Sequence, residues 1–153
     1  MQRPSPTFFQ IISTDYLAQN FFVMIFAGWV IYGIDALFQG RATFFLAIFA
    51  AILTPLGFIT FFWRYRLIVS TFSNGTEITG QVTEITTIPT GKNRRDYIVY
   101  YKYDLNGKAC QFRNRVKKNS YAQKLRQGQQ VNLLAHKKTP HITFIKEIYL
   151  ETN

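Results

Sequence analysis

The sequence has few of the residues that build catalytic and metal sites. Its 153 residues include one cysteine, Cys110, and two histidines, His136 and His141. A single thiol cannot form an internal disulfide or supply the three or four ligands of a Cys-type metal site. The chain also lacks an HExxH motif, a phosphate-binding glycine loop, a GxSxG motif and a paired-carboxylate arrangement. We therefore predict no metal, no cofactor, no catalytic residue and no enzymatic activity.

Charged residues are nearly missing from one part of the chain, residues 21–63, which contain only Asp35 and Arg41. Residues 64–153 hold 16 of the 18 Lys and Arg and 6 of the 8 Asp and Glu, a net charge of +10. This split predicts an apolar anchor joined to a basic soluble domain. The predicted boundaries are an N-terminal tail with an interfacial segment (1–20), a two-helix transmembrane hairpin (21–66) and a basic cytoplasmic β-domain (67–153).

Two apolar runs in the anchor are long enough to cross a bilayer. Residues 21–38 form a run of 18 positions and residues 43–63 a run of 21. Because a helix rises 1.5 Å per residue, about 20 residues span the ~30 Å hydrocarbon core. Residues 39–42 are predicted to form the tight turn of an antiparallel hairpin. Thr14 or Ser13 is the expected N-cap of the first span.

The distribution of Lys and Arg predicts the orientation of the spans. Trp63, Arg64, Tyr65 and Arg66 directly follow the second apolar run, and we assign them as membrane-interface anchors. The second helix is expected to continue to a C-cap at residues 74–75. An even number of spans with a basic C-terminal domain predicts cytoplasmic termini. We expect a multi-pass protein of the cell inner (plasma) membrane or another bacterial-type energy membrane.

The clearest signal in the β-domain is Asn106-Gly107 between two strand-like runs, a pair that favours a two-residue type I′ hairpin turn. That turn fixes a register, in which directly opposed residues share a face. The opposed pairs are Leu105 with Lys108, Tyr103 with Cys110, Tyr101 with Phe112, Val99 with Asn114 and Tyr97 with Val116. The predicted apolar face comprises Tyr97, Val99, Tyr101, Tyr103, Cys110, Phe112 and Val116.

Other parts of the β-domain have weaker signals. Residues 76–87 predict a strand with a bulge or bend at Gly80, and residues 88–95 a loop. A short helical turn is expected at 120–125, followed by strands at 130–137 and 142–150. The predicted fold class is an α+β membrane protein, with a two-helix transmembrane hairpin followed by a small all-β barrel-like domain, SH3-like or OB-like, with one short helical turn. An open five-stranded sheet packed on that turn is the alternative.

The order of these features resembles a known family. Its motifs here are Gly80-Gln81-Val82, the Tyr-rich strand with Asn106-Gly107, the helical turn, Gly128-Gln129-Gln130-Val131, and Thr139-Pro140. Over roughly residues 75–150 the chain resembles the bacterial membrane-anchored family called domain of unknown function 3592. The resemblance implies a membrane-anchored β-domain without catalytic residues, although both helices here precede the domain instead of flanking it.

Three functional interpretations are compatible with this sequence. The first is a non-enzymatic interaction module, an accessory or assembly subunit of a larger membrane protein complex, whose partners are membrane lipids and other subunits. The second, less favoured, is a membrane-tethered binder of anionic ligands such as nucleic acid or lipid headgroups. The third is that the charge only favours anionic headgroups and fixes topology. The candidate basic interaction surface comprises Arg94, Arg95, Arg113, Arg115, Lys117, Lys118, Lys137 and Lys138.

Overall fold

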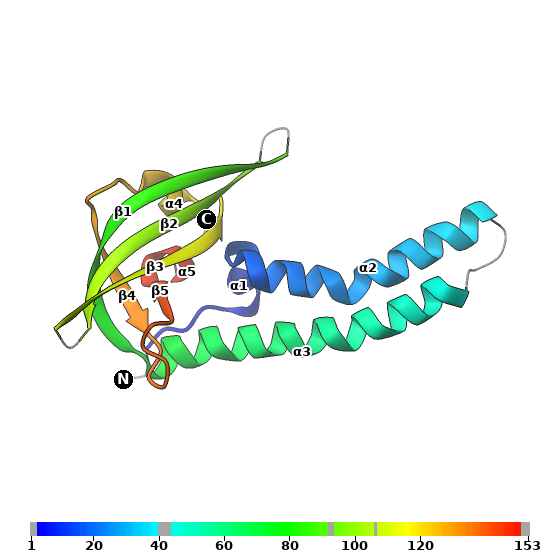
Figure 1. The fold of residues 1–153 in the computed structure, drawn as a ribbon, viewed down its shortest axis with the longest axis horizontal. Helices are drawn as coiled ribbons and strands as arrows, with labels where there is room; N and C mark the ends of the chain where they lie inside the picture. The colour runs from blue at the N-terminus through cyan, green and yellow to red at the C-terminus, as the bar shows by residue number, and fades with distance from the viewer. Residues whose placement is uncertain (1–2, 40–43, 92–93, 106, 151–153) are drawn as a thin grey trace. The chain divides into compact units, whose positions relative to one another are not determined.

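The computed structural model describes residues 3–39, 44–91, 94–105 and 107–150, and the chain divides into two compact units. Residues 17–65 form the first, here called the helical unit, and residues 1–16 with 66–153 form the second, here called the head. The elements in chain order are α1 (Phe8–Thr14), α2 (Tyr16–Gln39), α3 (Phe44–Asn74), β1 (Thr76–Gly91), β2 (Arg94–Leu105), β3 (Lys108–Lys117), α4 (Ser120–Lys124), β4 (Gln130–Ala135), β5 (Thr143–Ile145) and α5 (Lys146–Leu150) (Figure 1).

The helical unit is an antiparallel pair of long apolar helices, as predicted. Its contacts join Ile25 of α2 to Gly57 of α3, and the later Gly28 of α2 to the earlier Ala50 of α3. A Cβ atom on Gly28 would lie 2.7 Å from the Cα of Ala50, so glycine is required at this crossing. The predicted turn lies outside the described residues except for Gln39, the last residue of α2. The expected continuation of the second helix is confirmed, because α3 ends at residue 74.

The head is built on a five-stranded antiparallel sheet in the order β3-β2-β1-β4-β5. All five predicted pairs between β2 and β3 are present, from Leu105 opposite Lys108 to Tyr97 opposite Val116. Asn106 lies outside the described residues. Its neighbour Gly107 has φ 78°, the left-handed conformation that a type I′ turn requires. The alternating pattern and the turn were therefore sufficient to predict this register.

The hairpin between β1 and β2 differs from the predicted loop at 88–95. The ladder continues past Ile88, which lies opposite Asp96, and Pro89 lies opposite Arg95. Strand β1 extends to residue 91 and β2 begins at residue 94. The β-branched residues before Pro89 keep the chain extended, so the strands reach almost to the turn.

Gly80 is not the bulge of β1. The register shift lies between Val82 and Glu84, whereas Gly80 pairs regularly with Tyr103. A Cβ atom on Gly80 would lie 2.5 Å from Cδ1 of Leu133. A larger residue would displace the buried Leu133 side chain, so glycine fits this close approach to the backbone.

The predicted strand at 142–150 is a short strand followed by a helix. Only residues 143–145 pair with β4, and α5 begins at residue 146. Ile148 and Tyr149 are both buried, and they follow Ile145 at intervals of three and four residues, the period of a helix. The ring of Tyr149 packs against Phe72 and Phe144, with centroids 5.6 and 5.5 Å away. The predicted helical turn at 120–125 is confirmed as α4, whose N-cap is Asn119.

The sheet curls until β3 and β5 face each other, and the side chain of Asn114 bridges the gap. Its Oδ1 accepts a hydrogen bond from the Ile145 N–H at 3.2 Å, and its Nδ2 donates to the Thr143 carbonyl at 3.0 Å. The Tyr101 hydroxyl lies 3.0 Å from the same Oδ1. The Asn114 amide thus occupies the place of a neighbouring strand's peptide group. The head is therefore a nearly closed barrel-like sheet.

The N-terminal residues up to Tyr16 are part of the head. Thr7 caps α1 in a reciprocal capping box with Gln10, so Thr14 ends α1 and does not cap the first span. Ile11 is fully buried, and Asp15 Oδ2 accepts a hydrogen bond from the Tyr149 hydroxyl at 2.6 Å. These contacts dock α1 onto the rest of the head.

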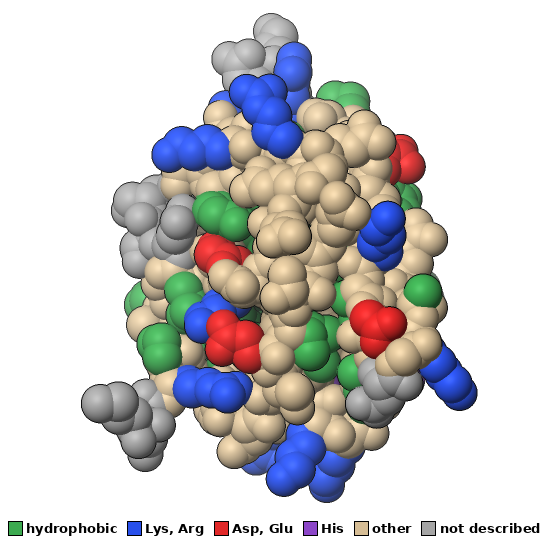
Figure 2. Space-filling model, turned by 90° about the vertical axis from the view of Figure 1, so that its left-hand side faces the viewer, with side chains coloured by type: hydrophobic (Ala, Val, Ile, Leu, Met, Phe, Trp, Pro, Cys, Tyr) green, Lys and Arg blue, Asp and Glu red, His purple; other side chains and the backbone are tan. Residues whose placement is uncertain are grey.

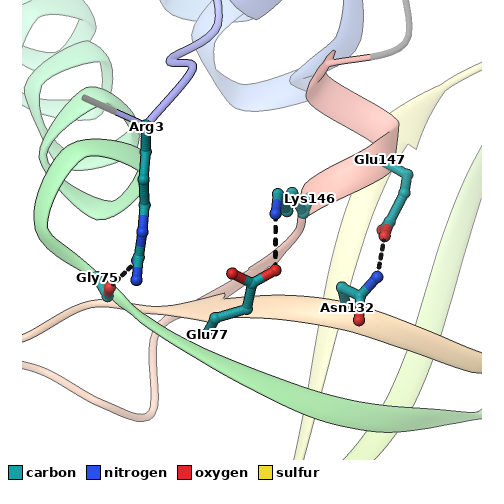
Figure 3. A network of polar contacts seen from close by, with 6 residues as sticks. All are labelled: Arg3, Gly75, Glu77, Asn132, Lys146 and Glu147. Carbon is teal, nitrogen blue, oxygen red and sulfur yellow. Dashed lines mark hydrogen bonds and ion pairs between the residues drawn. The ribbon is translucent and has the colours of Figure 1, made fainter. Parts of the chain in front are cut away.

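Polar contacts hold the ends of the head together (Figure 3). Arg3 Nη1 donates to the Gly75 carbonyl at 2.6 Å, which joins the start of the chain to the residue after α3. Lys146 Nζ lies 2.7 Å from Oε1 of Glu77, so α5 is tied to β1. Asn132 Nδ2 donates to Glu147 Oε1 at 2.6 Å, which ties α5 to β4.

The predicted apolar face of the β2–β3 hairpin is buried unevenly. Val99, Tyr101, Tyr103 and Val116 are buried, whereas Phe112 is only half-buried near the edge of the sheet.

Replacing Phe112 with alanine is expected to lower the free energy of unfolding by about 2 kcal/mol, less than the ~3–5 kcal/mol typical of a fully buried Phe. Arg113→Ala on the exposed face should change it by no more than about 0.5 kcal/mol. Denaturant titration of both variants measures the difference. Equal losses would mean that the two faces of β3 are wrongly assigned.

Candidate interaction surfaces

The helical unit presents large apolar side chains on its outer surface. Only 11% of the most apolar window of α2 and 17% of that of α3 is buried. Exposed residues on α2 include Phe26, Trp29, Val30, Ile31 and Ile34, and those on α3 include Ile52, Ile59, Phe62 and Trp63. A contiguous apolar surface of this kind is characteristic of an interaction site for lipid or protein.

Polar contacts of Thr54 join the two helices of this apolar unit, and one of them places its Oγ1 3.2 Å from the Ile25 carbonyl of α2. Trp29 Nε1 donates to Thr54 Oγ1 at 2.8 Å. Thr54 Oγ1 also lies 2.9 Å from the Ala50 carbonyl, to which it donates. The indole N–H and the threonine hydroxyl therefore both have partners, as required in an apolar environment.

The four predicted interface anchors are consecutive residues of α3, so they point in different directions around the helix. Trp63 is 61% exposed, and the ring of Tyr65 stacks on Phe61 with centroids 6.1 Å apart. Arg64 belongs with them to the helical unit, whereas the exposed Arg66 is the first residue of the head on this helix. The end of the apolar surface is thus aromatic and basic.

The predicted basic positions are divided between two ends of the sheet. Because Arg95 lies opposite Pro89 and Lys117 opposite Asp96, positions 94, 95, 117 and 118 lie at one end. Positions 137 and 138 follow β4, whose last residue Ala135 pairs with Thr76 at the other end of β1. On the face of the head shown in Figure 2, Lys and Arg lie around the rim, with Asp and Glu among them.

The other two predicted basic residues, Arg113 and Arg115, lie on the outer face of β3 and contact other side chains. Arg115 Nη2 lies 3.4 Å from Asp96 Oδ2, and its guanidinium lies 3.4 Å from the centroid of the Tyr16 ring. Arg115 therefore joins β3 to the N-terminal segment. Arg113 Nη1 donates to the Tyr100 hydroxyl at 3.4 Å, and its guanidinium lies 6.0 Å from that ring centroid. Arg113 is exposed, so it remains accessible to a ligand.

The buried polar groups of the barrel interior serve the fold. Besides its contact with Asn114, the Tyr101 hydroxyl lies 2.9 Å from the Thr143 carbonyl. Burial raises the pKa of the Tyr103 hydroxyl, and its hydrogen bond to Thr143 opposes this while Cys110 adds to it. Tyr103 is therefore protonated at neutral pH and donates to the Pro140 carbonyl at 3.4 Å. These groups connect β2 with β5 and its preceding turn.

A shallow hollow of 360 Å³ lies on the outer face of the sheet and is lined by residues of β1, β2, β3 and β4. Its lining includes Lys102, Asp104 and Gln130. Because the lysine and the aspartate have opposite charges, the hollow has no clear preference for a charged ligand.

Sequence reasoning missed the residues that dock the N-terminal segment, Asp15, Tyr16 and Tyr149. The segment does contain one usable signal, since Thr7 followed by Gln10 matches the spacing of a capping box. That motif predicts a separate helix before the first span. Its docking depends on residues more than a hundred positions away, for which the sequence has no local pattern.

Within the described ranges, no three His, Cys, Asp or Glu side chains form a group that could hold a metal ion. The described residues form a pair of apolar helices and a barrel-like sheet. The buried polar groups of the barrel bond to one another, and basic side chains lie at its two ends. Comparison of the chain with protein-family models, curated proteins and solved structures finds no match.

Proposed function

We propose that this protein is a membrane-anchored, non-enzymatic interaction module, an accessory or assembly subunit of a larger membrane protein complex. The exposed apolar surface of α2 and α3 is the observation that supports this most strongly. Transfer of this apolar surface from water into a bilayer would be favourable by about 25 cal/mol for each Å² removed from water. A bilayer core of about 30 Å matches helices of this length, whereas in water their large side chains would remain solvated.

The proposed topology has both termini in the cytoplasm of a bacterial-type cell. It is supported by the composition of the head, because residues 1–16 and 66–153 form one compact unit. The segments before and after the helical pair must then lie on the same side of a membrane. The Lys and Arg excess of residues 64–153 favours the cytoplasmic side.

Cysteine labelling tests this topology. In intact cells, a membrane-impermeant maleimide is expected to label a Gly40→Cys variant that carries Cys110→Ser. A Thr79→Cys variant that also carries Cys110→Ser should react only after the membrane is permeabilised, because exposed position 79 belongs to the head and the head lies inside. Extracellular protease that cleaves between Arg94 and Arg95 in intact cells would contradict the proposed orientation.

The form of the head supports a role in docking. Strand β4 returns beside β1 and gives the order 4-1-2-3 of a Greek key, so we favour the OB-like over the SH3-like alternative. In the described part of the sheet, β3 pairs along its length with β2 and meets β5 through the side chain of Asn114. The outer edge of β3 is bridged by Asp15 at Val116 and meets β5 at Asn114, so we propose that the backbone groups nearer Lys108 receive a partner strand.

Purification of the full chain from its native membrane in mild detergent tests the proposed role. We expect the same integral membrane chains to co-purify in near-stoichiometric amounts. They should remain bound near 1 M salt, where the Debye length is about 3 Å, because docking of a subunit depends on buried contacts. Recovery of the chain alone at every salt concentration would refute the accessory-subunit proposal.

Binding of an anionic ligand remains a second candidate because of one observation. Tyr100 and Arg113 lie together on the outer face of β2 and β3, where an aromatic ring and a guanidinium can hold a base and a phosphate. If nucleic acid is the ligand, affinity for single strands should fall steeply with salt, and Arg113→Ala should reduce that slope. If the affinity for single strands and its dependence on salt are the same as those of an unrelated basic protein, nucleic acid is not the ligand.

A further inference from the structure

Helix α1 has two different faces. Ile11 and Thr14 are buried against the rest of the head, whereas Phe8 and Phe9 are 39% and 81% exposed. The two phenylalanine rings meet edge to face, with centroids 5.7 Å apart. The seven residues of α1 contain no charged side chain. The head therefore has an apolar outer surface at α1.

Basic side chains lie at the same end of the head as α1. A bridge between Asp15 and Val116 places the end of α1 beside the last residues of β3. Lys118 follows directly, and Arg95 lies at this end of β2; both side chains are exposed.

The nearby acids do not offset these charges at the surface. Asp15 is 1% exposed and Asp96 is 5% exposed. The Asp15 carboxylate accepts a hydrogen bond from Tyr149, and the Asp96 carboxylate pairs with Arg115. The exposed charge contributed by Arg95 and Lys118 at this end is therefore positive.

We propose that this end of the head, defined by Phe8, Phe9, Arg95 and Lys118 and here called the α1 end, docks on the surface of an anionic phospholipid bilayer. The proposal rests on the membrane anchoring proposed above. A seven-residue helix is about 10 Å long, and Asp15 alone separates α1 from α2. If α2 enters the bilayer, the chain keeps Phe8 and Phe9 within about 10–15 Å of its entry point.

The chemistry of the α1 end matches that of an anionic membrane interface. Aromatic side chains concentrate at the headgroup level, and apolar residues combined with Lys or Arg bind anionic surfaces. Each Lys or Arg near such a surface favours binding by about fivefold. Docking by α1 fixes the orientation of the head, because α1 is itself tied to α5 and β3. The face in Figure 2, on the opposite side of the head from α1, then remains open to a protein partner.

Environment-sensitive labels in the reconstituted full chain test this contact. Three variants carry a single cysteine in place of Phe9, Thr79 or Phe26, each combined with Cys110→Ser, and this cysteine holds a nitrobenzoxadiazole label. Each variant is placed in nanodiscs of phosphatidylcholine alone or with about 30% phosphatidylglycerol. We expect shallow spin-labelled lipid to quench the label at position 9, and iodide to quench that at exposed position 79. Deep spin-labelled lipid should quench the label at position 26 in α2.

Charge reversal in the same assay tests which basic residues contribute. Arg95→Glu with Lys118→Glu should lower the ratio of lipid-contacting to water-exposed label at position 9 by at least fivefold in the anionic nanodiscs. The matched control, Lys137→Glu with Lys138→Glu at the other end of the sheet, should leave that ratio unchanged. Equal effects of the two pairs would overturn the assignment of the α1 end.

The label positions separate failure of this inference from failure of the anchor. If position 9 is as accessible to iodide as position 79 while position 26 contacts lipid, the α1 end does not dock and the anchor proposal stands. If position 26 is itself accessible to iodide, the membrane anchor is refuted and the docking proposal with it.

Discussion

Replacing Ile11 with alanine is expected to lower the free energy of unfolding of the head by about 2–5 kcal/mol, the usual cost of truncating a buried Ile. Ile11 is fully buried, and removing its side chain leaves a cavity where α1 meets the head. The single cysteine provides the measurement, since half-buried Cys110 becomes accessible to a thiol reagent as the head unfolds in urea.

Phe9→Ala is the matched control for this prediction. Phe9 lies on the same helix but is 81% exposed, so its truncation should change the unfolding free energy by at most about 0.5 kcal/mol. Similar small effects for both variants would mean that residues 1–16 are a tail that does not stabilise the head. In that case the domain boundaries drawn from sequence alone would be the better description.

Truncation of Asn114 to alanine is expected to destabilise the head by about 2–4 kcal/mol. The buried Ile145 N–H loses its acceptor, which costs about 1–3 kcal/mol for an unsatisfied group, and the Thr143 carbonyl loses one donor. The Thr143 carbonyl retains the Tyr101 hydroxyl, and this limits the loss. Urea titration gives the free energy, and hydrogen exchange should show faster exchange of the Ile145 amide.

Asn132→Ala is the matched control, because it removes an asparagine side chain that is exposed instead of buried. Asn132 is exposed on β4 and its side chain donates to Glu147, so Asn132→Ala should cost about 1 kcal/mol or less. If Asn114→Ala is no more costly than Asn132→Ala, the side chain does not hold β3 to β5. Closure of the barrel would then depend on the apolar core alone.

The sequence was informative where structure depends on neighbouring residues. Asn106-Gly107 and the alternation around it are sufficient to set the register from Leu105 opposite Lys108 onward. The apolar length of residues 43–63 and the following Asn74-Gly75 similarly predict the extent of α3. Each of these patterns lies within one helix or one hairpin, where local propensity and geometry decide the outcome.

Contacts between distant parts of the chain were not predictable from the sequence. Asn114 is polar, and its position opposite Val99 on the apolar face has an explanation only when β5 lies beside it. Asp15 likewise looks like a first-turn acid of a span until Tyr149 is seen to donate to it. A buried polar residue is specified by its partner, and no periodicity identifies that partner.

The sequence identified the basic residues of the candidate interaction surface but not where they lie in the fold. Eight basic positions were known from sequence, but their division between the ends of the sheet depends on strand order and on the long β1 hairpin. Arg115 has the same charge as Arg113, but its guanidinium lies between Asp96 and Tyr16 and serves the fold. A count of charges cannot separate residues with structural partners from residues that are open to a ligand.

We propose that residues 17–65 are a membrane anchor inserted into a single head. Extraction of membranes with alkaline carbonate tests it most directly, with the full chain compared to a variant whose residues 17–65 are replaced by a Gly-Ser linker of about 12 residues. We predict that the full chain stays in the membrane pellet, while the linker variant is soluble and protects Cys110 to the same urea concentration. Release of the full chain by carbonate would show that residues 17–65 do not anchor the protein, and a linker variant that is unfolded or remains in the pellet would show that the head does not fold as a separate soluble unit.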